Sequence, residues 1–383
     1  MKRIVSALAV FAFIAALASC ENGVQLVGPA AEDCSARPYF SVLPVALADI
    51  DKITVHGGLS APGHTLPTPH AGLYLATEGA VVRAPGPLQI TGLRRTTYVA
   101  SPTRQGKTDF VADFQVCKQV SGWFGHLTTL SEAIPVTGGW NDCKRYNTST
   151  ETVETCTATL DGVSLSAGQT LGTGGLSKAL GLMGLDFGLT DSRVNNGFVA
   201  EWRFPEPHRR AICAWDRFES SVQSQLYTKL SDPSRFGSVA LGEPRCGTMK
   251  VDVAGTAKGI WALSSVKSPL GGSEVDYITL ANYPYRPETQ LALSLGPSSL
   301  GADVAVVARG TGSGRVNRPF EQVTNDGLIY CYGPDSTRPV TSWLIMMTGP
   351  NALSIRRVED RVSNPCNSAP ATWSMTGALT LVR

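Results

Sequence analysis

Short apolar runs, broken by glycine and proline, dominate the chain between about residues 51 and 204. Several of these runs alternate apolar with polar positions, which is the period expected of a half-buried β-strand. The segments with this pattern are 53–56, 72–76, 81–84, 96–100, 110–117 and 153–160. Residues 127–133 could form a helical turn. The pattern predicts a β domain of ordinary size over residues 49–205.

After residue 205 the pattern changes to a helix and then returns to strands. Apolar residues recur at spacings of three and four over residues 213–230, which places them on one helical face, and Asp232-Pro233 would end this helix. Strand-like runs then follow at near-regular spacing between residues 249 and 382. Because prolines interrupt both patterns at residues 205–207, we expect a second β-rich domain over residues 206–383, a sandwich or barrel with one helix.

The first residues of the chain are predicted to be an export signal. Lys2 and Arg3 precede an apolar segment over residues 4–17, and Leu17-Ala18-Ser19-Cys20 closes the segment with small residues. This tetrapeptide resembles the bacterial lipobox, in which the cysteine is lipidated and becomes the mature N-terminus. The alternative is an ordinary secretory signal that contains a cysteine by chance.

The lipobox implies that residues 1–19 are removed, that Cys20 carries the lipid, and that residues 20–48 form a tether. The apolar segment is shorter than the ~20 residues of a comfortable membrane span. No other segment is long and apolar enough, so the rest of the chain is expected to be water-soluble and held to the membrane by its lipid. Glu21 stands where an inner-membrane retention signal would place aspartate, which favours the outer membrane.

The charge balance argues against a nucleic-acid partner. Loss of residues 1–19 leaves 31 basic residues against 31 acidic ones. A neutral chain without a basic block lacks the charge that neutralises phosphates, on which affinity for nucleic acids depends. The 39 glycines and 24 prolines favour short strands and turns over helices.

The cysteines agree with export. Nine are present, and eight remain when Cys20 is set aside. An even set in an exported chain predicts up to four disulfides, and the lack of a Cys-x-x-Cys spacing disfavours a zinc ribbon. The sequence does not determine the pairing. The short intervening loop favours Cys143–Cys156, and proximity along the chain also favours Cys213–Cys246 and Cys331–Cys366.

Three short segments carry the candidate chemistry. Pro67-Thr-Pro-His70-Ala-Gly-Leu-Tyr74 and Trp123-Phe-Gly-His126-Leu each place a lone histidine beside turn residues at a strand end, and Gly184-Leu-Asp186-Phe-Gly-Leu follows. Their order and spacing resemble the site segments of the lysostaphin-like (LytM-type) zinc endopeptidases, which cut bacterial cell-wall peptides. Residues 82–85 and 165–174 resemble the strand and the glycine-rich turn that connect these segments in the family.

The resemblance implies a zinc site with three protein ligands and one open position for water. The first family ligand is a histidine, matched by His70, and the second is an aspartate four residues later, where this chain has Tyr74. The family's final His-x-His is replaced by Gly184 and Asp186, with Asp186 at the metal-ligand position. His126 matches a catalytic histidine. Tyrosine ligates metals only when deprotonated, and its usual pKa of ~10 makes Tyr74 a poor replacement.

Two outcomes are compatible with this altered pattern, which covers roughly residues 51–190. In one, His64 from the preceding loop joins His70 and Asp186 as a zinc ligand set, and His126 acts as a general base or stabilises the transition state. In the other, the pocket has lost its metal and kept its shape, with the histidines left as hydrogen-bonding or packing residues.

Other chemistry-bearing residues are expected to be structural. His56 lies on a strand beside two glycines, His208 is expected to be solvated at the domain junction, and Asp191 reads as a turn residue. There is no Gly-x-Ser-x-Gly elbow, and the glycine-rich segment 310–315 lacks the ending of a phosphate loop. Aromatic residues of the second domain are expected in its core rather than on a sugar-binding face: Trp261, Tyr277, Tyr283, Tyr285, Tyr330, Tyr332 and Trp343.

The sequence therefore predicts a lipid-anchored protein of the cell envelope with a degenerate lysostaphin-like domain. Its expected role is to bind peptidoglycan or another envelope or extracellular peptide or glycan without cleaving it. The rival is an active metalloendopeptidase that uses zinc held by His64, His70 and Asp186, with His126 as the catalytic residue. A third possibility is a purely structural lipoprotein. The membrane, through lipid on Cys20, is the other expected partner.

Overall fold

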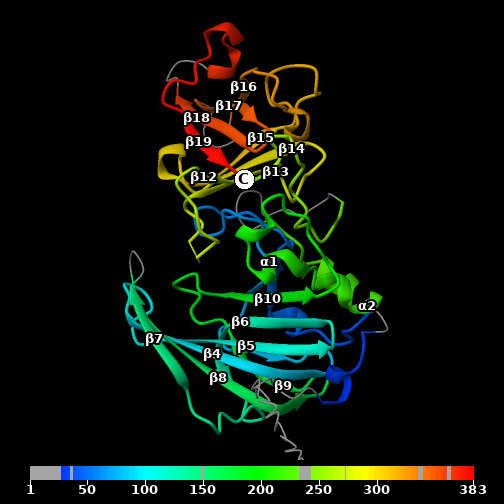
Figure 1. Ribbon diagram of the computed structural model, residues 1–383. Helices are drawn as coiled ribbons and strands as arrows, with labels where there is room; N and C mark the ends of the chain where they lie inside the picture. Colours follow the sequence, from blue (N-terminus) through cyan, green and yellow to red (C-terminus); the bar gives the residue numbers. More distant parts are fainter. Residues whose placement is uncertain are drawn as a thin grey trace, which may run out of the picture.

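The chain folds into two β-sheet units stacked one above the other (Figure 1). The computed structural model describes residues 27–34, 38–147, 151–232, 243–271, 273–334, 340–359 and 364–383. The predicted signal peptide, Cys20 and the start of the tether lie outside the described residues. All pairs of named strands are antiparallel, and the mainly β fold class predicted from the sequence is confirmed.

The first unit is built on an 11-stranded sheet. Its main path runs through eight strands in the order β1-β2-β10-β6-β5-β4-β8-β7, and three short strands pair at its side. The strands are β1 (Ile50–Ile53), β2 (His70–Leu75), β3 (Ala80–Arg83), β4 (Leu88–Ala100), β5 (Thr108–Cys117), β6 (Val120–Leu130), β7 (Asn141–Asn147), β8 (Thr152–Leu165), β9 (Thr170–Gly174), β10 (Gly184–Asp191) and β11 (Ala211–Ile212). Residues 127–130, expected to form a helical turn, instead continue strand β6.

Aromatic side chains pack on one face of this sheet and hold the central strands β6 and β10 in position relative to each other. Phe187 of β10 stacks on Phe124 of β6 with ring centroids 4.4 Å apart, and Trp215 packs edge-on against Phe187 at 5.6 Å. The Trp215 indole also donates a hydrogen bond of 2.9 Å to the carbonyl of Thr54. Since successive side chains of a strand point to opposite faces, the neighbours of Phe187 point away from this core.

Residues 38–48 and 206–230 pack with the first unit, although the sequence pattern assigned them to a tether and to the second domain. Phe40 is buried and forms a β-bridge with Phe218. Helix α1 (Glu206–Arg210) leads into β11, which pairs with β10. Helix α2 (Ser220–Tyr227) is shorter than the predicted helix over 213–230, because Phe218 is extended where it bridges Phe40.

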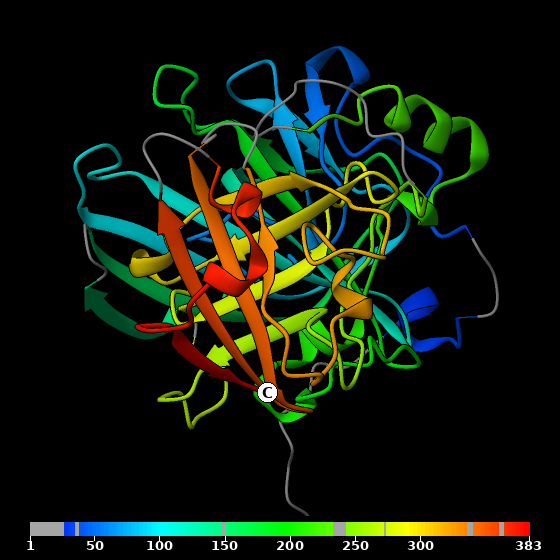
Figure 2. The same ribbon diagram turned by 90° about the horizontal axis from the view of Figure 1, so that it is seen from above.

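The second unit is built on an 8-stranded sheet in the order β15-β14-β13-β12-β19-β18-β17-β16. Its strands are β12 (Gly259–Leu263), β13 (Tyr277–Asn282), β14 (Gln290–Leu295), β15 (Val304–Ala308), β16 (Tyr330–Tyr332), β17 (Thr341–Gly349), β18 (Ala352–Glu359) and β19 (Leu379–Val382). The sheet curls into a nearly closed, barrel-like form, with β17 and β18 folded over β13 and β14 (Figure 2). The aromatic residues considered for a sugar-binding face are buried, as expected of core residues.

Disulfides brace both units. Cys143–Cys156, Cys213–Cys246 and Cys331–Cys366 are the three pairs favoured by the sequence, and Cys34–Cys117 is a fourth. Four disulfides fit an extracellular or cell-envelope location, where thiols are oxidised. None of the helices in the described part of the chain has the length and apolar character to span a membrane.

A carboxylate of the second unit holds a loop of the first. Oε2 of Glu274 accepts a hydrogen bond of 2.7 Å from the backbone amide of Leu66. This loop also carries His64, whose backbone pairs with Ser60. Burial raises the pKa of the Glu274 carboxyl to about 7, although the backbone hydrogen bonds to Leu66 and Thr65 oppose the change. Folding therefore favours the protonated form of Glu274.

We expect the Glu274→Gln variant to have a flatter dependence of stability on pH. The pKa of Glu274 is higher in the folded protein than in the unfolded chain, so its contribution to stability is present at low pH and is lost as pH rises through about 7. In the wild type, titration of Glu274 should lower the free energy of unfolding by roughly 2–3 kcal/mol as the pH rises from about 5 to about 8. Urea unfolding at both pH values measures the fall.

Glu288→Gln serves as the control, because Glu288 is exposed and its loss should leave the wild-type dependence on pH intact. Equal pH dependence in the wild type and in Glu274→Gln would contradict the assignment.

Candidate functional site

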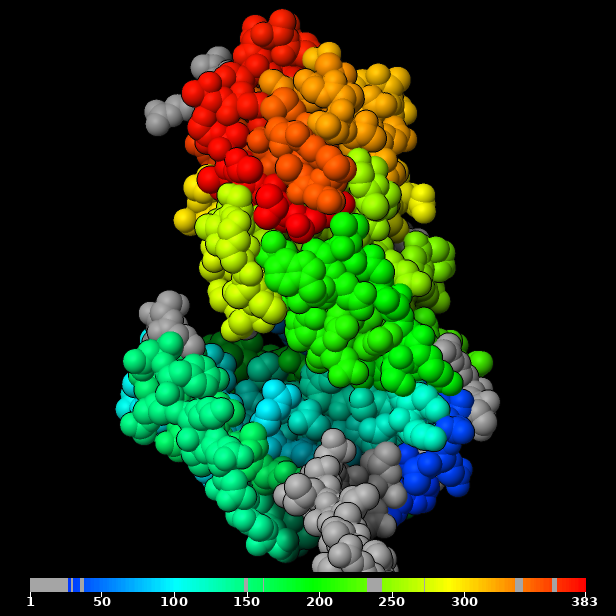
Figure 3. All heavy atoms as spheres, viewed as in Figure 1, coloured from blue at the N-terminus to red at the C-terminus, as the bar shows by residue number. Residues whose placement is uncertain are grey.

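One pocket of about 360 Å³ is lined by every candidate site residue that the sequence predicted within the described part of the chain. It lies on the face of the first sheet opposite the aromatic core, and Tyr285 of the second unit also lines it. Figure 3 shows that the surface is hollowed between the β7–β8 end of the large sheet and the unit above it. The predicted residues that line the pocket are His64, His70, Tyr74, His126, Gly184 and Asp186.

The pairing of β10 with its two neighbours brings these segments together. Asp186 lies opposite Gly72 of β2 and opposite Gly125 of β6. His70 and Tyr74, two residues to either side of Gly72, therefore share the pocket face with Asp186. A Cβ atom on Gly125 would lie 3.2 Å from the Asp186 carboxylate, so glycine at this position leaves room for that side chain.

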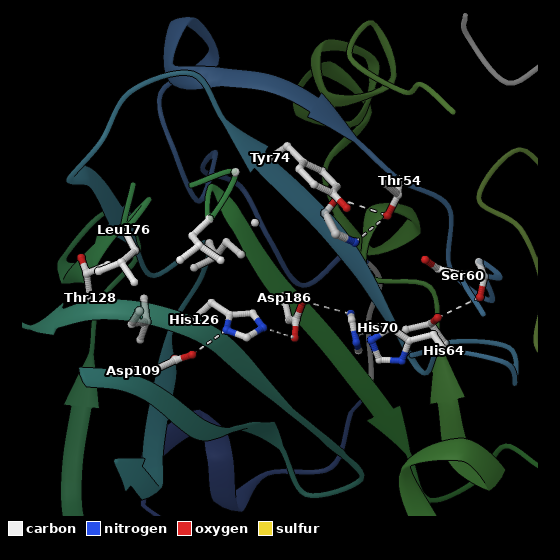
Figure 4. Close-up of a pocket in the computed structure, with 18 of the residues that line it drawn as sticks. Thr54, Ser60, His64, His70, Tyr74, Asp109, His126, Thr128, Leu176 and Asp186 are labelled. Atoms are coloured by element: carbon white, nitrogen blue, oxygen red, sulfur yellow. Dashed lines mark hydrogen bonds and ion pairs between the residues drawn. The ribbon is translucent and has the colours of Figure 1, made fainter. Parts of the chain in front are cut away.

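His126 is held between two carboxylates (Figure 4). Its Nδ1 lies 2.7 Å from Oδ2 of Asp109, and its Nε2 lies 3.4 Å from Oδ2 of Asp186. The backbone of His126 is left-handed, with φ of 63°, where the pairing of β6 with β5 is irregular. A non-glycine residue is uncommon in this region, and such strain is frequent where a side chain must be aimed at a site.

The two carboxylates determine the charge of His126. The hydrogen bond to Asp109 is the largest effect, and together with the charges of Asp186 and Asp109 it raises the pKa of His126 to about 9, against the opposing effect of burial. At neutral pH the ring is therefore an imidazolium, which donates a hydrogen bond from Nδ1 to Asp109 and forms an ion pair with Asp186 through Nε2. In this state it suits hydrogen bonding or charge stabilisation, whereas a general base would have to be deprotonated.

A hydrogen-bonded chain behind Asp109 was not apparent from the sequence. The Tyr98 hydroxyl lies 3.4 Å from Oδ2 of Asp109 and accepts a hydrogen bond of 2.8 Å from Arg104. Arg104 in turn forms an ion pair of 2.6 Å with Glu151. These residues belong to no local motif, because they meet only when β4, β5 and β8 pair across the sheet.

The other two histidines of the pocket are uncharged at neutral pH. Burial lowers the pKa of His70, whose Nδ1 lies 3.4 Å from Oδ1 of Asp186 and makes no aligned hydrogen bond to any residue that the structure describes. His64 packs edge-on against His70 with ring centroids 5.6 Å apart. Desolvation by the pocket wall, together with His70, lowers the pKa of His64.

The predicted ligand set does not fit a zinc ion in this arrangement. Across the described ranges, the only three His, Cys, Asp or Glu side chains whose ligand atoms lie within 4.8 Å of one another are Cys213, Asp216 and Cys246, and the two cysteines are disulfide-bonded. His64, His70 and Asp186 form no such group. Burial and the charge of Asp186 raise the pKa of Tyr74, which disfavours the deprotonated form that ligates a metal.

The other four histidines of the chain all lie within electrostatic reach of His70. Burial lowers the pKa of His56 to about 3 and that of His208 to about 4. The expectation that His208 is solvated is wrong, since only 8% of its surface is exposed. The pocket is thus lined by two neutral histidines, His64 and His70, and by the charged His126, while His56 and His208 lie buried outside its lining.

No family model matches this chain, and the comparisons with curated proteins and with solved structures found no match. The resemblance to the lysostaphin-like enzymes therefore stays a prediction from the motifs. The geometry adds that the matched positions share one face of three paired strands.

We expect Asp109→Asn to lower the pKa of His126 from about 9 toward its usual range, because the hydrogen bond to Asp109 is the largest cause of the increase. Long-range ¹H–¹⁵N NMR spectra of the imidazole nitrogens between about pH 5 and pH 10 measure the titration. Asp113→Asn is the control, since Asp113 lies on the same strand but pairs with Arg94. A wild-type His126 that titrates like a free histidine would contradict the arrangement.

Proposed function

We propose that the protein is an exported, lipid-anchored binding protein of the bacterial cell envelope. Its pocket binds an envelope or extracellular peptide or glycan and does not cleave it. The observation that carries this proposal is the ion-paired centre of the pocket, in which the His126 imidazolium lies between Asp109 and Asp186. Such a centre offers fixed hydrogen-bond donors and acceptors, which is what a pre-formed binding site requires.

The changed positions support binding over hydrolysis. A hydrolytic zinc site needs three protein ligands and an open position for water. Here Tyr74 stands where the resemblance requires a carboxylate, and its phenol is held protonated. Gly184 supplies no side chain where the family has an assisting histidine. Asp186 forms an ion pair with His126 and faces the neutral ring of His70, so its charge is already compensated within the protein.

One observation favours the rival reading, an active metallopeptidase. Nδ1 of His70 makes no aligned hydrogen bond within the described chain and points to the Asp186 carboxylate. A movement of His64 toward these two groups would assemble two nitrogens and one oxygen, a set that zinc accepts. Metal content and cleavage of a peptide substrate distinguish the two functions.

We expect the tag-free mature protein to contain no stoichiometric zinc at neutral pH and to leave peptidoglycan stem peptides intact. The double variant Tyr74→Asp/Asp186→His should bind about one zinc ion per chain, because it places a histidine, a carboxylate and a second histidine on one face of β2 and β10. Elemental analysis after dialysis measures the metal.

His70→Ala in the double variant is the control and should remove the zinc. Stoichiometric zinc in the wild type, lost in His70→Ala and accompanied by peptide cleavage, would establish the peptidase and overturn the binding proposal.

The lipid anchor rests on the signal sequence, since Cys20 lies outside the described residues. We expect Cys20→Ala to abolish incorporation of labelled palmitate in a bacterial host and to shift the protein from the membrane to the soluble fraction. Ser19→Ala keeps a small residue before the cysteine and should leave labelling intact. Palmitate labelling that persists in Cys20→Ala would exclude this anchor.

A further inference from the structure

We infer that the pocket continues along the large sheet as a groove that binds a neutral saccharide segment of the ligand. This inference rests on the proposed binding function and assigns a chemical class to part of the ligand. We call this continuation the sheet groove. It has a volume of about 330 Å³. Beyond the residues that it shares with the pocket, its principal lining residues are Arg94, Thr96, Trp123, Tyr146, Glu151 and Val153.

The sheet groove and the pocket are continuous at the ion-paired centre. Both are lined by Tyr98, Arg104, Asp109, His126 and Asp186. A ligand that contacts Asp186 in the pocket can therefore extend over β4, β5 and β8 toward β7. Together the two spaces match the volume range of sites that enclose a small ligand of several rings.

Aromatic rings supply flat apolar surfaces in this groove. The Trp123 indole lies directly on the backbone of Gly188, where a Cβ atom would come within 2.2 Å of Cζ2, so the exposed part of the ring faces the groove. Tyr146 of β7 is 51% exposed. Tyr98 also lines the groove, but it is only 6% exposed and Arg104 lies over its ring at 4.0 Å, so Trp123 and Tyr146 supply the accessible aromatic surface. Rings of this kind offer a wide contact area with a polar tip, which suits the apolar C–H face and the hydroxyls of a sugar ring.

The charges of the groove are already paired, which disfavours an ionic ligand. Arg94 lies 3.4 Å from Asp113, Arg104 lies 2.6 Å from Glu151, and His126 contacts both Asp109 and Asp186. A charged ligand would have to break one of these pairs and leave its former partner uncompensated, which is costly in a partly buried site. A neutral ligand avoids that cost.

Paired side chains still have hydrogen-bonding capacity for hydroxyl groups. Arg104 has five N–H donors, and its hydrogen bonds to Glu151 and Tyr98 use three of them. The Thr96 and Thr155 hydroxyls, 3.0 Å apart, add further groups that donate and accept. Flat aromatic faces, neutral overall charge and many fixed donors and acceptors together describe a site for a neutral saccharide rather than for a charged peptide.

Isothermal titration of the mature protein tests the inference with three probes: the β-1,4-linked tetramer of N-acetylglucosamine, the β-1,4-linked tetramer of glucose, and a peptidoglycan stem tetrapeptide without sugar. We expect at least one tetrasaccharide to bind and Tyr146→Ala to weaken that binding roughly tenfold. Tyr146→Phe keeps the ring and should lose much less. Trp202→Ala removes an exposed aromatic residue outside the groove and should keep the wild-type affinity.

Failure of the saccharide assignment differs from failure of the proposed function. Binding of the tetrapeptide with no response to either tetrasaccharide would overturn the saccharide groove and leave a peptide-binding protein. Equal losses in Tyr146→Ala and Trp202→Ala would also overturn it. Cleavage of the tetrapeptide would overturn the proposed function itself. If Tyr146→Ala does not fold, the wild type can be titrated with a tetrasaccharide while its amide NMR shifts are recorded. Shift changes centred on residues 94–98 would support the saccharide groove, and changes elsewhere would contradict it.

Discussion

Strand β10 lies between β2 and β6, and its register determines which side chains reach the pocket. Phe187 stacks on Phe124 in the core, and Asp186, the next residue along the strand, must then point to the opposite face. A slip of one residue would place the Phe187 ring in the pocket and bury the carboxylate in an apolar core, at a large cost in free energy. The packing of two phenylalanines thus holds the position of the charge at the centre of the site.

The charge of Asp186 in turn organises the titratable groups around it. It favours the protonated form of His126 and disfavours ionisation of Tyr74, so each neighbour is kept in a state that can donate a hydrogen bond. A neutral imidazole in place of this carboxylate would remove both effects, and a protonated one would reverse them. The carboxylate is therefore consistent with a site that recognises a ligand through defined protonation states, without requiring a metal ion to organise its geometry.

The grouping of His70, His126 and Asp186 was predicted from three short segments whose order and spacing resemble those of the lysostaphin-like enzymes, and these residues line one pocket. The glycines beside His70 and His126 and the alternation around Asp186 identify strand segments that expose one polar face. The grouping of Asp109, Tyr98, Arg104 and Glu151 was not accessible, because their proximity depends on pairing between strands distant in sequence.

Other parts of the fold depend on contacts that no local pattern encodes. The apolar residue Phe40 looks like part of a tether until Phe218 forms a bridge with it, and the same bridge shortens the helix that the periodicity of residues 213–230 predicts. His208 lies in a polar run at residues 206–210, yet α1 packs it into the interior. Three disulfides were accessible because their cysteines are close along the chain, whereas Cys34–Cys117 joins residues 83 positions apart.

Strand β7 ends the strand order of the large sheet, and all seven of its residues are exposed. Such an edge can recruit a strand from another molecule, which leads to aggregation. Here Cys143 is bonded to Cys156 of β8, Asp142 has a left-handed backbone with φ of 48°, and the pairing is irregular between Asn141 and Lys144. An edge strand that is irregular, basic and disulfide-bonded to its neighbour pairs poorly with a strand from another molecule. The exposed edge of the large sheet is therefore poorly suited to add a strand from another molecule.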